Sequence, residues 1–149
     1  MIKGIIFDFN RTVYDPDANA LVDGVKTLLD ELQKQKIKMA LLCKKGGGDR
    51  AEIISSLGLE PYFCKILIVE GRKKPEHLQE CLDAMGVAAD ESAVVGDRVV
   101  EEISAGNQIG MKTIWYKQGK FSSELPQTDA QKPAHTILNM ADILEIVKQ

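Results

Sequence analysis

The chain has 149 residues, of which 44% are hydrophobic and 28% charged, and 22 acidic residues stand against 19 basic ones. This length predicts one globular domain over residues 1–149, and the near-average composition excludes a disordered chain. The slight acidic excess argues against a nucleic-acid partner, and no segment approaches the ~20 apolar residues of a membrane span.

Short apolar runs alternate with helical patterns along the chain. In chain order, the predicted strands are Gly4–Phe7, Lys38–Cys43, Ile66–Val69, Ala93–Val95, Lys112–Tyr116 and a short Thr136–Leu138. The predicted helices are Leu21–Lys36, Arg50–Leu57, Pro75–Met85, Val100–Ile109 and Ala141–Lys148, and Gln118–Pro133 is predicted as a polar loop. This alternation predicts an α/β, three-layer Rossmann-like fold, with a mainly parallel sheet of five or six strands and helices on both faces.

Three cysteines, Cys43, Cys64 and Cys81, show neither an even count nor zinc-binding spacing. Reduced thiols and the absence of a signal-peptide pattern lead us to expect a cytoplasmic protein.

Polar side chains follow the predicted strands at the edge of the sheet where ligands of such folds bind. Asp8 follows the first strand, Asp97 follows the fourth, and Glu102 lies in the first turn of the next helix. Lys73 and Lys74 follow the third strand and precede Pro75. Carboxylates beside a lysine suit Mg²⁺, with a phosphate group bridging the metal and the lysine.

The order of these residues resembles the four motifs of the haloacid dehalogenase-like hydrolase superfamily. The matching stretches are Asp8-x-x-x-Thr12, the residue ending the second strand, Lys74-Pro75, and Gly96-Asp97 followed by Glu102. The resemblance spans about residues 2 to 120, and Val94–Ile114 is its best stretch. Neither place where the family inserts a cap domain has room for one here, so the resemblance is to a small, capless member.

The resemblance implies a role for each matching residue. Asp8 would be the nucleophile that forms an aspartyl-phosphate and also a Mg²⁺ ligand. Asp97 would be a second ligand, and Glu102 would support the metal directly or through water, whereas Glu101 is better explained as a helix N-terminal acid. Lys74 would neutralise the nucleophile and the phosphoryl group; Lys73 is its rival, and Lys74 is preferred because it directly precedes Pro75.

Three positions depart from the family pattern. Asn10 stands where the phosphatases carry the general acid/base Asp; its amide cannot transfer protons, although its backbone carbonyl remains a possible metal ligand. Cys43 replaces the Ser or Thr whose hydroxyl holds the phosphate, and an anion-binding loop of Lys44, Lys45 and the N–H groups of Gly46–Gly48 is the predicted compensation. Arg11 replaces a small residue, usually Gly. We assign Arg11, Thr12, Cys43 and Lys44 to substrate or phosphate binding.

The sequence thus predicts a Mg²⁺-dependent phosphatase whose activity Asn10 lowers. The expected substrate is a phosphorylated small molecule or macromolecule, and no association with a membrane is expected. A homo-oligomer is an option, since a neighbouring subunit can cover a capless site. A catalytically impaired phosphate- or protein-binding module is the alternative, and dehalogenase or phosphonatase chemistry is a more distant one.

Overall fold

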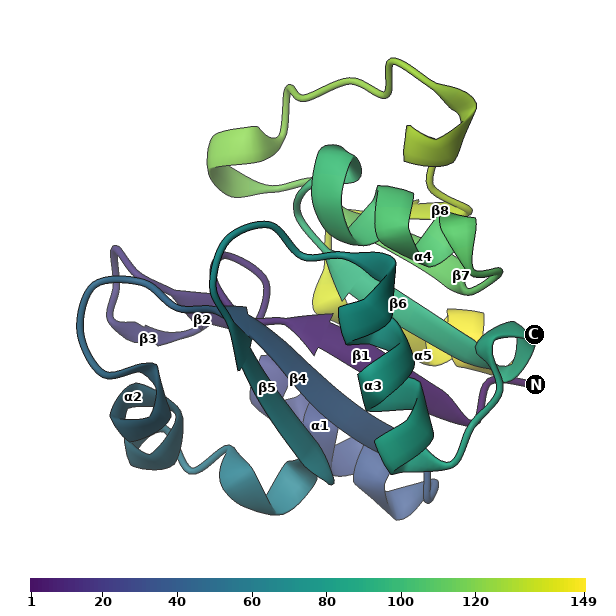
Figure 1. Cartoon of the computed structure of the whole chain (residues 1–149). Coiled ribbons are helices and arrows are strands. Elements are labelled where there is room, and N and C mark those ends of the chain that lie inside the picture. Colours follow the sequence, from purple (N-terminus) through teal and green to yellow (C-terminus); the bar gives the residue numbers. More distant parts are fainter.

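The computed structural model describes all residues, 1–149, and is built around a six-stranded sheet in which every neighbouring pair is parallel (Figure 1). The strands are β1 (Gly4–Asp8), β4 (Lys38–Lys44), β5 (Lys65–Val69), β6 (Ser92–Gly96), β7 (Lys112–Tyr116) and β8 (His135–Ile137), in the spatial order β5-β4-β1-β6-β7-β8. All five residues of β1 are buried, as expected for a central strand covered on both faces.

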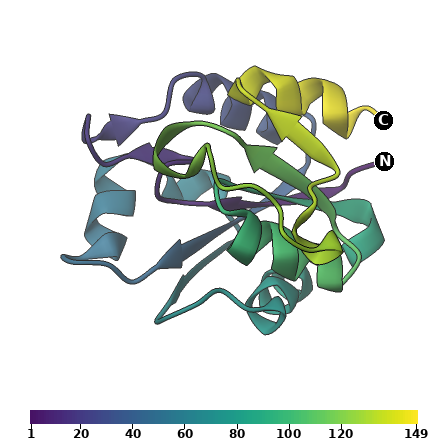
Figure 2. The same cartoon turned by 90° about the horizontal axis from the view of Figure 1, so that it is seen from above.

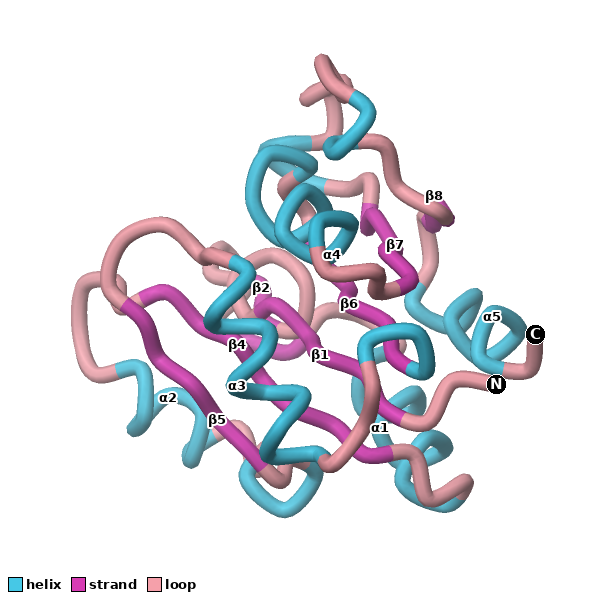
Figure 3. Tube along the Cα trace, turned by 45° about the vertical axis from the view of Figure 1, so that its right-hand side comes forward, coloured by secondary structure: helices cyan, strands magenta, loops and turns pink.

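Helices cover both faces of this sheet, which gives three layers (Figure 2). The helices are α1 (Val25–Lys34), α2 (Arg50–Ser56), α3 (Pro75–Met85), α4 (Ser104–Gln108) and α5 (Ile143–Val147). Alternate residues of each strand face opposite layers, so the core divides into two clusters. Ile5 and Phe7 of β1 pack with α1, α2 and α5, whereas Ile6 packs with α3 and α4. Figure 3 shows α3 in front of the sheet and α1 behind it.

The predicted fold class is confirmed, and the predicted strands correspond to the six observed ones. One difference lies between β1 and α1, where the chain forms a hairpin of β2 (Tyr14–Asp15) and β3 (Ala20–Leu21). Leu21 pairs with Tyr14 in this hairpin, so the helix begins at Val25 and not at Leu21 as its apolar spacing suggested. No helix has the length and apolar character needed to cross a membrane.

A second difference lies after β6. The predicted helix Val100–Ile109 is divided into a wide π-helical turn, Val99–Ile103, and α4. Such turns are rare and occur frequently at functional sites. This one buries two acidic side chains, Glu101 and Glu102, beside the carboxyl end of β1.

Candidate active site

Three acidic side chains meet at the carboxyl edge of the sheet. Asp8 is the last residue of β1, and Asp97 directly follows β6, which is hydrogen-bonded to β1. Carboxylate oxygens of Asp8, Asp97 and Glu102 lie within 4.8 Å of one another, and all three residues are buried. The parallel pairing of β1 and β6, with the turn that follows β6, therefore brings together three of the four residues that the sequence suggested as metal ligands.

Glu102 reaches this cluster because Gly96 has no side chain. A Cβ atom at residue 96 would lie 2.7 Å from Glu102 Oε2 and 2.8 Å from its Cγ, which is closer than real Cβ contacts. The backbone N–H of Arg98 also donates to Glu102 Oε2, at 3.3 Å. The end of β6 and the π-helical turn thus hold Glu102 by close contact.

The buried lysine of the site is Lys73, which corrects the sequence-based choice of Lys74. Lys73 Nζ donates to Glu102 Oε1 at 2.7 Å and also forms an ion pair with Asp8. Its side chain is 4% exposed, whereas Lys74 is exposed at the N-cap of α3. Lys74 has an extended backbone, in which successive side chains point to opposite sides, so only one of the two lysines faces the cluster.

Two groups near Asp8 orient its carboxylate. The backbone N–H of Phe9 donates to Asp8 Oδ1 at 2.8 Å, and the Thr12 hydroxyl donates to Oδ2 at 3.4 Å. Thr12 is 0% exposed and its hydroxyl is directed at Asp8, so the structure adds no support to its assignment to phosphate binding, which stays a prediction. Its position behind Asp8 fits a supporting role, in which its hydrogen bond limits the rotation of the carboxylate.

Burial dominates the electrostatics of the cluster. Desolvation raises the pKa of Asp8 to about 6, although Lys73 opposes the shift, and Asp97 adds to it. Desolvation and the charge of Asp8 raise the pKa of Glu102 to about 7. Burial alone would lower the pKa of Lys73, but Asp8 and Glu102 raise it above its ordinary value, so this lysine stays protonated. The site holds more negative than positive charge and favours an added cation.

Asp97 is held by Arg11, and one of its oxygens is left without a partner. Arg11 Nε donates to Asp97 Oδ2 at 2.9 Å, and Trp115 Nε1 donates to the backbone carbonyl of Asp97 at 3.0 Å. Asp97 Oδ1 is buried and makes no hydrogen bond. An unpaired buried carboxylate oxygen costs free energy, and its position in the acidic cluster makes it a ready ligand for a cation.

Arg11 adopts a backbone conformation that is unusual for a large side chain. Its φ is 62°, in the left-handed region that favours glycine, and such a conformation costs on the order of 1–3 kcal/mol. The guanidinium lies 4.8 Å from the ring centre of Phe121, which also packs against Arg98 at 3.9 Å. The structure thus shows a backbone conformation at Arg11 that would suit a glycine, and it places the Arg11 side chain beside Asp97.

At the end of β4, a thiol stands where the family resemblance places the hydroxyl group that holds the phosphate. Cys43 is buried, its Sγ donates to the Lys44 carbonyl at 3.3 Å, and desolvation raises its pKa to about 11. Lys44 Nζ pairs with Glu101 Oε2 at 2.9 Å, so a phosphate bound by Lys44 would compete with this carboxylate. Burial would raise the pKa of Glu101, but hydrogen bonds from Lys44 and the Lys73 backbone lower it. Glu101 therefore lies outside the cluster of Asp8, Asp97 and Glu102.

Arg50 is a further basic residue at this edge that the sequence analysis did not identify. Its guanidinium packs against Gly46 and lies 5.9 Å from the ring centre of Phe9, and its Nε is buried without a partner. The pKa of Cys43 responds to the charges of Arg50, Lys73 and Asp8, so all three lie near the thiol. The one sequence feature that could have drawn attention to Arg50 is its place directly after Asp49, the N-cap of α2. Arg50 is therefore a candidate anion ligand.

The cluster fits a hard divalent cation. Three carboxylates offer oxygen ligands, which Mg²⁺ prefers, and Asp97 Oδ1 has no competing hydrogen bond. The side-chain Oδ1 of Asn10 is also buried without a partner. Asn10, on the turn after β1, is thus a second residue with a buried side-chain oxygen that has no hydrogen-bond partner.

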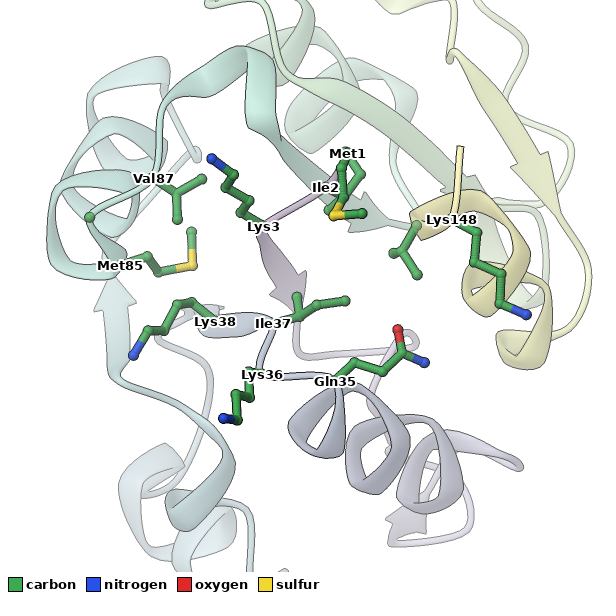
Figure 4. Close-up of a pocket in the computed structure, with 12 residues that line it drawn as sticks. Met1, Ile2, Lys3, Gln35, Lys36, Ile37, Lys38, Met85, Val87 and Lys148 are labelled. Atoms are coloured by element: carbon green, nitrogen blue, oxygen red, sulfur yellow. The ribbon is translucent and has the colours of Figure 1, made fainter.

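A pocket of about 480 Å³ lies at the edge of the sheet where the strands begin, opposite the edge that carries the acidic cluster (Figure 4). Lys3, Lys36, Lys38 and Lys148 surround its apolar residues, but their amino groups point in different directions. Lys3 and Lys148 pair with neighbouring glutamates, so no shared anion site forms there.

Residues 2–116 match the model of the haloacid dehalogenase-like hydrolase family. The chain belongs to this family. Among its relatives is a glyceraldehyde 3-phosphate phosphatase of Pyrococcus furiosus, 29% identical over 86% of this chain and 55% of the relative. An N-acylneuraminate-9-phosphatase of Mus musculus is 27% identical over 83% of this chain and 50% of the relative. The chain thus spans about half the length of the curated relatives it matches.

Solved structures agree with the haloacid dehalogenase-like fold. The HAD-hydrolase YfnB of Bacillus subtilis, solved with bound magnesium, has a TM-score of 0.83 at 13% identity, over 99% of each chain. A 2-haloacid dehalogenase of Pseudomonas syringae has a TM-score of 0.79 at 18% identity, also over 99% of each chain. These likenesses establish the fold of the whole chain.

Proposed function

We propose that this chain is a Mg²⁺-dependent phosphohydrolase that acts on phosphomonoesters through a covalent phosphate on Asp8. The observation that carries the proposal is the buried cluster of Asp8, Asp97 and Glu102, with Lys73 bonded to two of its members. Family membership supports a hydrolase, and the curated relatives are named as phosphatases of small molecules. Each part of the cluster has a definite task in such a reaction.

The reaction proceeds in two displacements at phosphorus. In the first, a carboxylate oxygen of Asp8 forms a bond to phosphorus, and the bond between phosphorus and the leaving alkoxide oxygen breaks. In the second, water attacks the phosphorus of the aspartyl-phosphate and releases inorganic phosphate and free Asp8. Dividing hydrolysis in this way replaces one difficult step by two easier ones.

Lys73 provides positive charge where negative charge develops. Its ammonium group contacts Asp8 in a site from which water is largely excluded, so its charge acts strongly on a phosphoryl group bound there. Arg50, the first residue of α2, has a buried Nε without a hydrogen-bond partner and is suited to hold a phosphate oxygen in place of the missing hydroxyl at Cys43.

Mg²⁺ would be held by Asp8, Asp97 and Glu102, with the backbone carbonyl of Asn10 as a further ligand. When bound, Mg²⁺ supplies charge that offsets the phosphate and the carboxylates. Arg11 fixes Asp97 through Oδ2 and leaves Oδ1 for the cation. The protein residues therefore orient the ligands before a cation arrives.

Asn10 sets the expected rate. An amide neither donates a proton to the leaving alkoxide nor accepts one from water, and general acid/base catalysis typically contributes roughly 10²–10⁴-fold. We therefore propose a slow phosphatase, in which solvent supplies and removes the protons.

A phosphate-release assay tests this function. The protein is incubated with Mg²⁺ and a panel of phosphomonoesters, with Asp8→Asn as the matched control. Release above that control supports the proposal, and its absence across the panel refutes it. Asn10→Asp should raise the rate by about two orders of magnitude or more if the remaining machinery is intact.

A second candidate function is a phosphate-responsive binding module without turnover, and the observation that favours it is again Asn10. Such a module should bind Mg²⁺ together with beryllium fluoride, a mimic of aspartyl-phosphate, without releasing phosphate from any substrate. If Asn10→Asp then still gives no hydrolysis, the binding module is the better description.

A further inference from the structure

Arg11 has hydrogen-bonding capacity that the site described above does not use. Its side chain makes one hydrogen bond to the protein, from Nε to Asp97, so its two terminal amino groups have no protein acceptor. Arginine donates in a planar fork that matches a carboxylate or phosphate, and here the second half of the fork is free. The side chain is 27% exposed, so a molecule from solvent can reach it.

Two contacts fix where this free half of the fork lies. The bond to Asp97 holds the guanidinium at the edge of the acidic cluster, and the Phe121 ring packs against it at 4.8 Å. The backbone of Arg11 is held in the left-handed region, which is maintained only where the surrounding structure enforces it. The guanidinium is therefore presented in one place, close to the phosphoryl group that Asp8 would attack.

Arg11 lines a pocket of a size suited to a small molecule. Arg11 forms part of a pocket of about 600 Å³ between the β2–β3 hairpin and the residues after β7. Its other basic lining residue is Lys120, and Asp15, Asp17 and Asp23 are its acidic ones. These three carboxylates disfavour an extended polyanion, so an added negative group is best accommodated beside Arg11.

We propose that Arg11 recognises a second anionic group on the substrate, which makes short phosphomonoesters that also carry a carboxylate the preferred substrate class. This inference rests on the phosphatase function proposed above. The phosphate lies over Asp8 and Lys73, and the carboxylate accepts hydrogen bonds from the terminal amino groups of Arg11. Specificity is thus provided by a residue of the turn after β1.

Two substrates that differ in one group test the proposal. Glycerol 3-phosphate and 3-phosphoglycerate share a three-carbon skeleton, and the second carries a carboxylate where the first has a hydroxymethyl group. Wild-type protein should favour 3-phosphoglycerate in kcat/KM by about 10- to 100-fold, the range expected for hydrogen bonds to a charged group. Because both substrates use the same cation site, the ratio is insensitive to changes in Mg²⁺ affinity.

Three variants identify the source of this ratio. Arg11→Gln and Arg11→Gly both remove the guanidinium, the second without backbone strain, and both should bring the ratio close to one. Lys34→Gln removes a charge from a distant surface residue and should leave the ratio unchanged. A wild-type ratio near one, or a ratio that survives in both Arg11 variants, overturns the inference.

Failure of the proposed function is distinguishable from failure of this inference. If wild-type protein hydrolyses both substrates equally, the phosphatase function stands and the role of Arg11 is refuted. If it hydrolyses neither, the phosphatase function fails, and the dissociation constants of the same two compounds are measured by calorimetry with Mg²⁺ present. Tighter binding of 3-phosphoglycerate that is lost in Arg11→Gln then supports the inference, and equal binding refutes it.

Discussion

Replacing Lys73 by methionine removes the one ammonium group inside the acidic cluster while keeping a long apolar side chain. Lys73 Nζ bonds to Asp8 and Glu102, and all three side chains are at most 5% exposed. Breaking a buried ion pair by removing one partner costs about 3–5 kcal/mol, because the remaining charge stays buried. Lys73→Met should therefore lower the free energy of unfolding by about this amount at pH 8 in the presence of EDTA.

The loss should be smaller at low pH. In the metal-free wild type, Asp8 and Glu102 have pKa values of about 6 and 7, above their ordinary values of 3.8 and 4.5. The folded chain thus binds more protons than the unfolded chain in this window, and its stability falls as the pH rises from 4 to 7. Without Lys73 both pKa values rise further, so at pH 5.5 the two carboxyl groups are neutral and the cost falls to about 1–2 kcal/mol, mainly lost hydrogen bonds.

Urea unfolding at pH 5.5 and pH 8 measures both quantities, and Lys74→Met is the matched control. Lys74 is exposed, so its replacement should change the free energy of unfolding by less than about 0.5 kcal/mol at either pH. Phosphate release should fall by about 10²–10³-fold in Lys73→Met and remain near wild type in Lys74→Met. Equal effects of the two substitutions, or a pH-independent loss in Lys73→Met, would refute the assignment of Lys73.

Further predictions concern the cation and the phosphate. Gly96→Ala should displace Glu102 and weaken Mg²⁺ binding by about 10- to 100-fold, measured by calorimetry; unchanged affinity would contradict the close contact at residue 96. Mg²⁺ affinity should rise between pH 5.5 and pH 7.5, because protons leave Asp8 and Glu102 on binding, and affinity independent of pH in this range would show that these carboxylates are not the ligands. Arg50→Gln should raise the inhibition constant of inorganic phosphate by about tenfold, whereas Lys34→Gln should not; equal constants in the two variants would exclude Arg50 as a phosphate ligand.

Much of the fold follows from local patterns. Buried strands read as short apolar runs, and their alternation with helices restricts the topology to a parallel sheet. Because parallel strands end at one edge, the sequence also indicated that Asp8 and Asp97 would be neighbours. The hairpin at Tyr14–Leu21 escaped prediction, since each of its strands has two residues and the apolar spacing of the following helix extends into it.

The parts of the site that the sequence did not reveal depend on tertiary contacts. Which of Lys73 and Lys74 faces the cluster is set by the backbone direction before α3, and adjacent identical residues carry no signal for it. The bond from Arg11 to Asp97 joins residues 86 positions apart. The position of Arg50 depends on packing against Gly46 and Phe9. Each of these three features depends on contacts that form only when the chain has folded.

The central place of β1 in the sheet has a consequence for how the protein folds. Asp8 ends the earliest of the six strands of this sheet in chain order, yet its ionic partner Lys73 is 65 residues away, and the neighbouring strand β6 begins at Ser92. Closing such long loops costs entropy before the contacts form, so folding of parallel sheets is comparatively slow. During synthesis, β1 must remain without one of its two neighbours until β6 has been made. Cation binding at the acidic cluster therefore requires β1, β6 and the turn that follows β6, because a nascent chain that ends before β6 has only one of the three carboxylates.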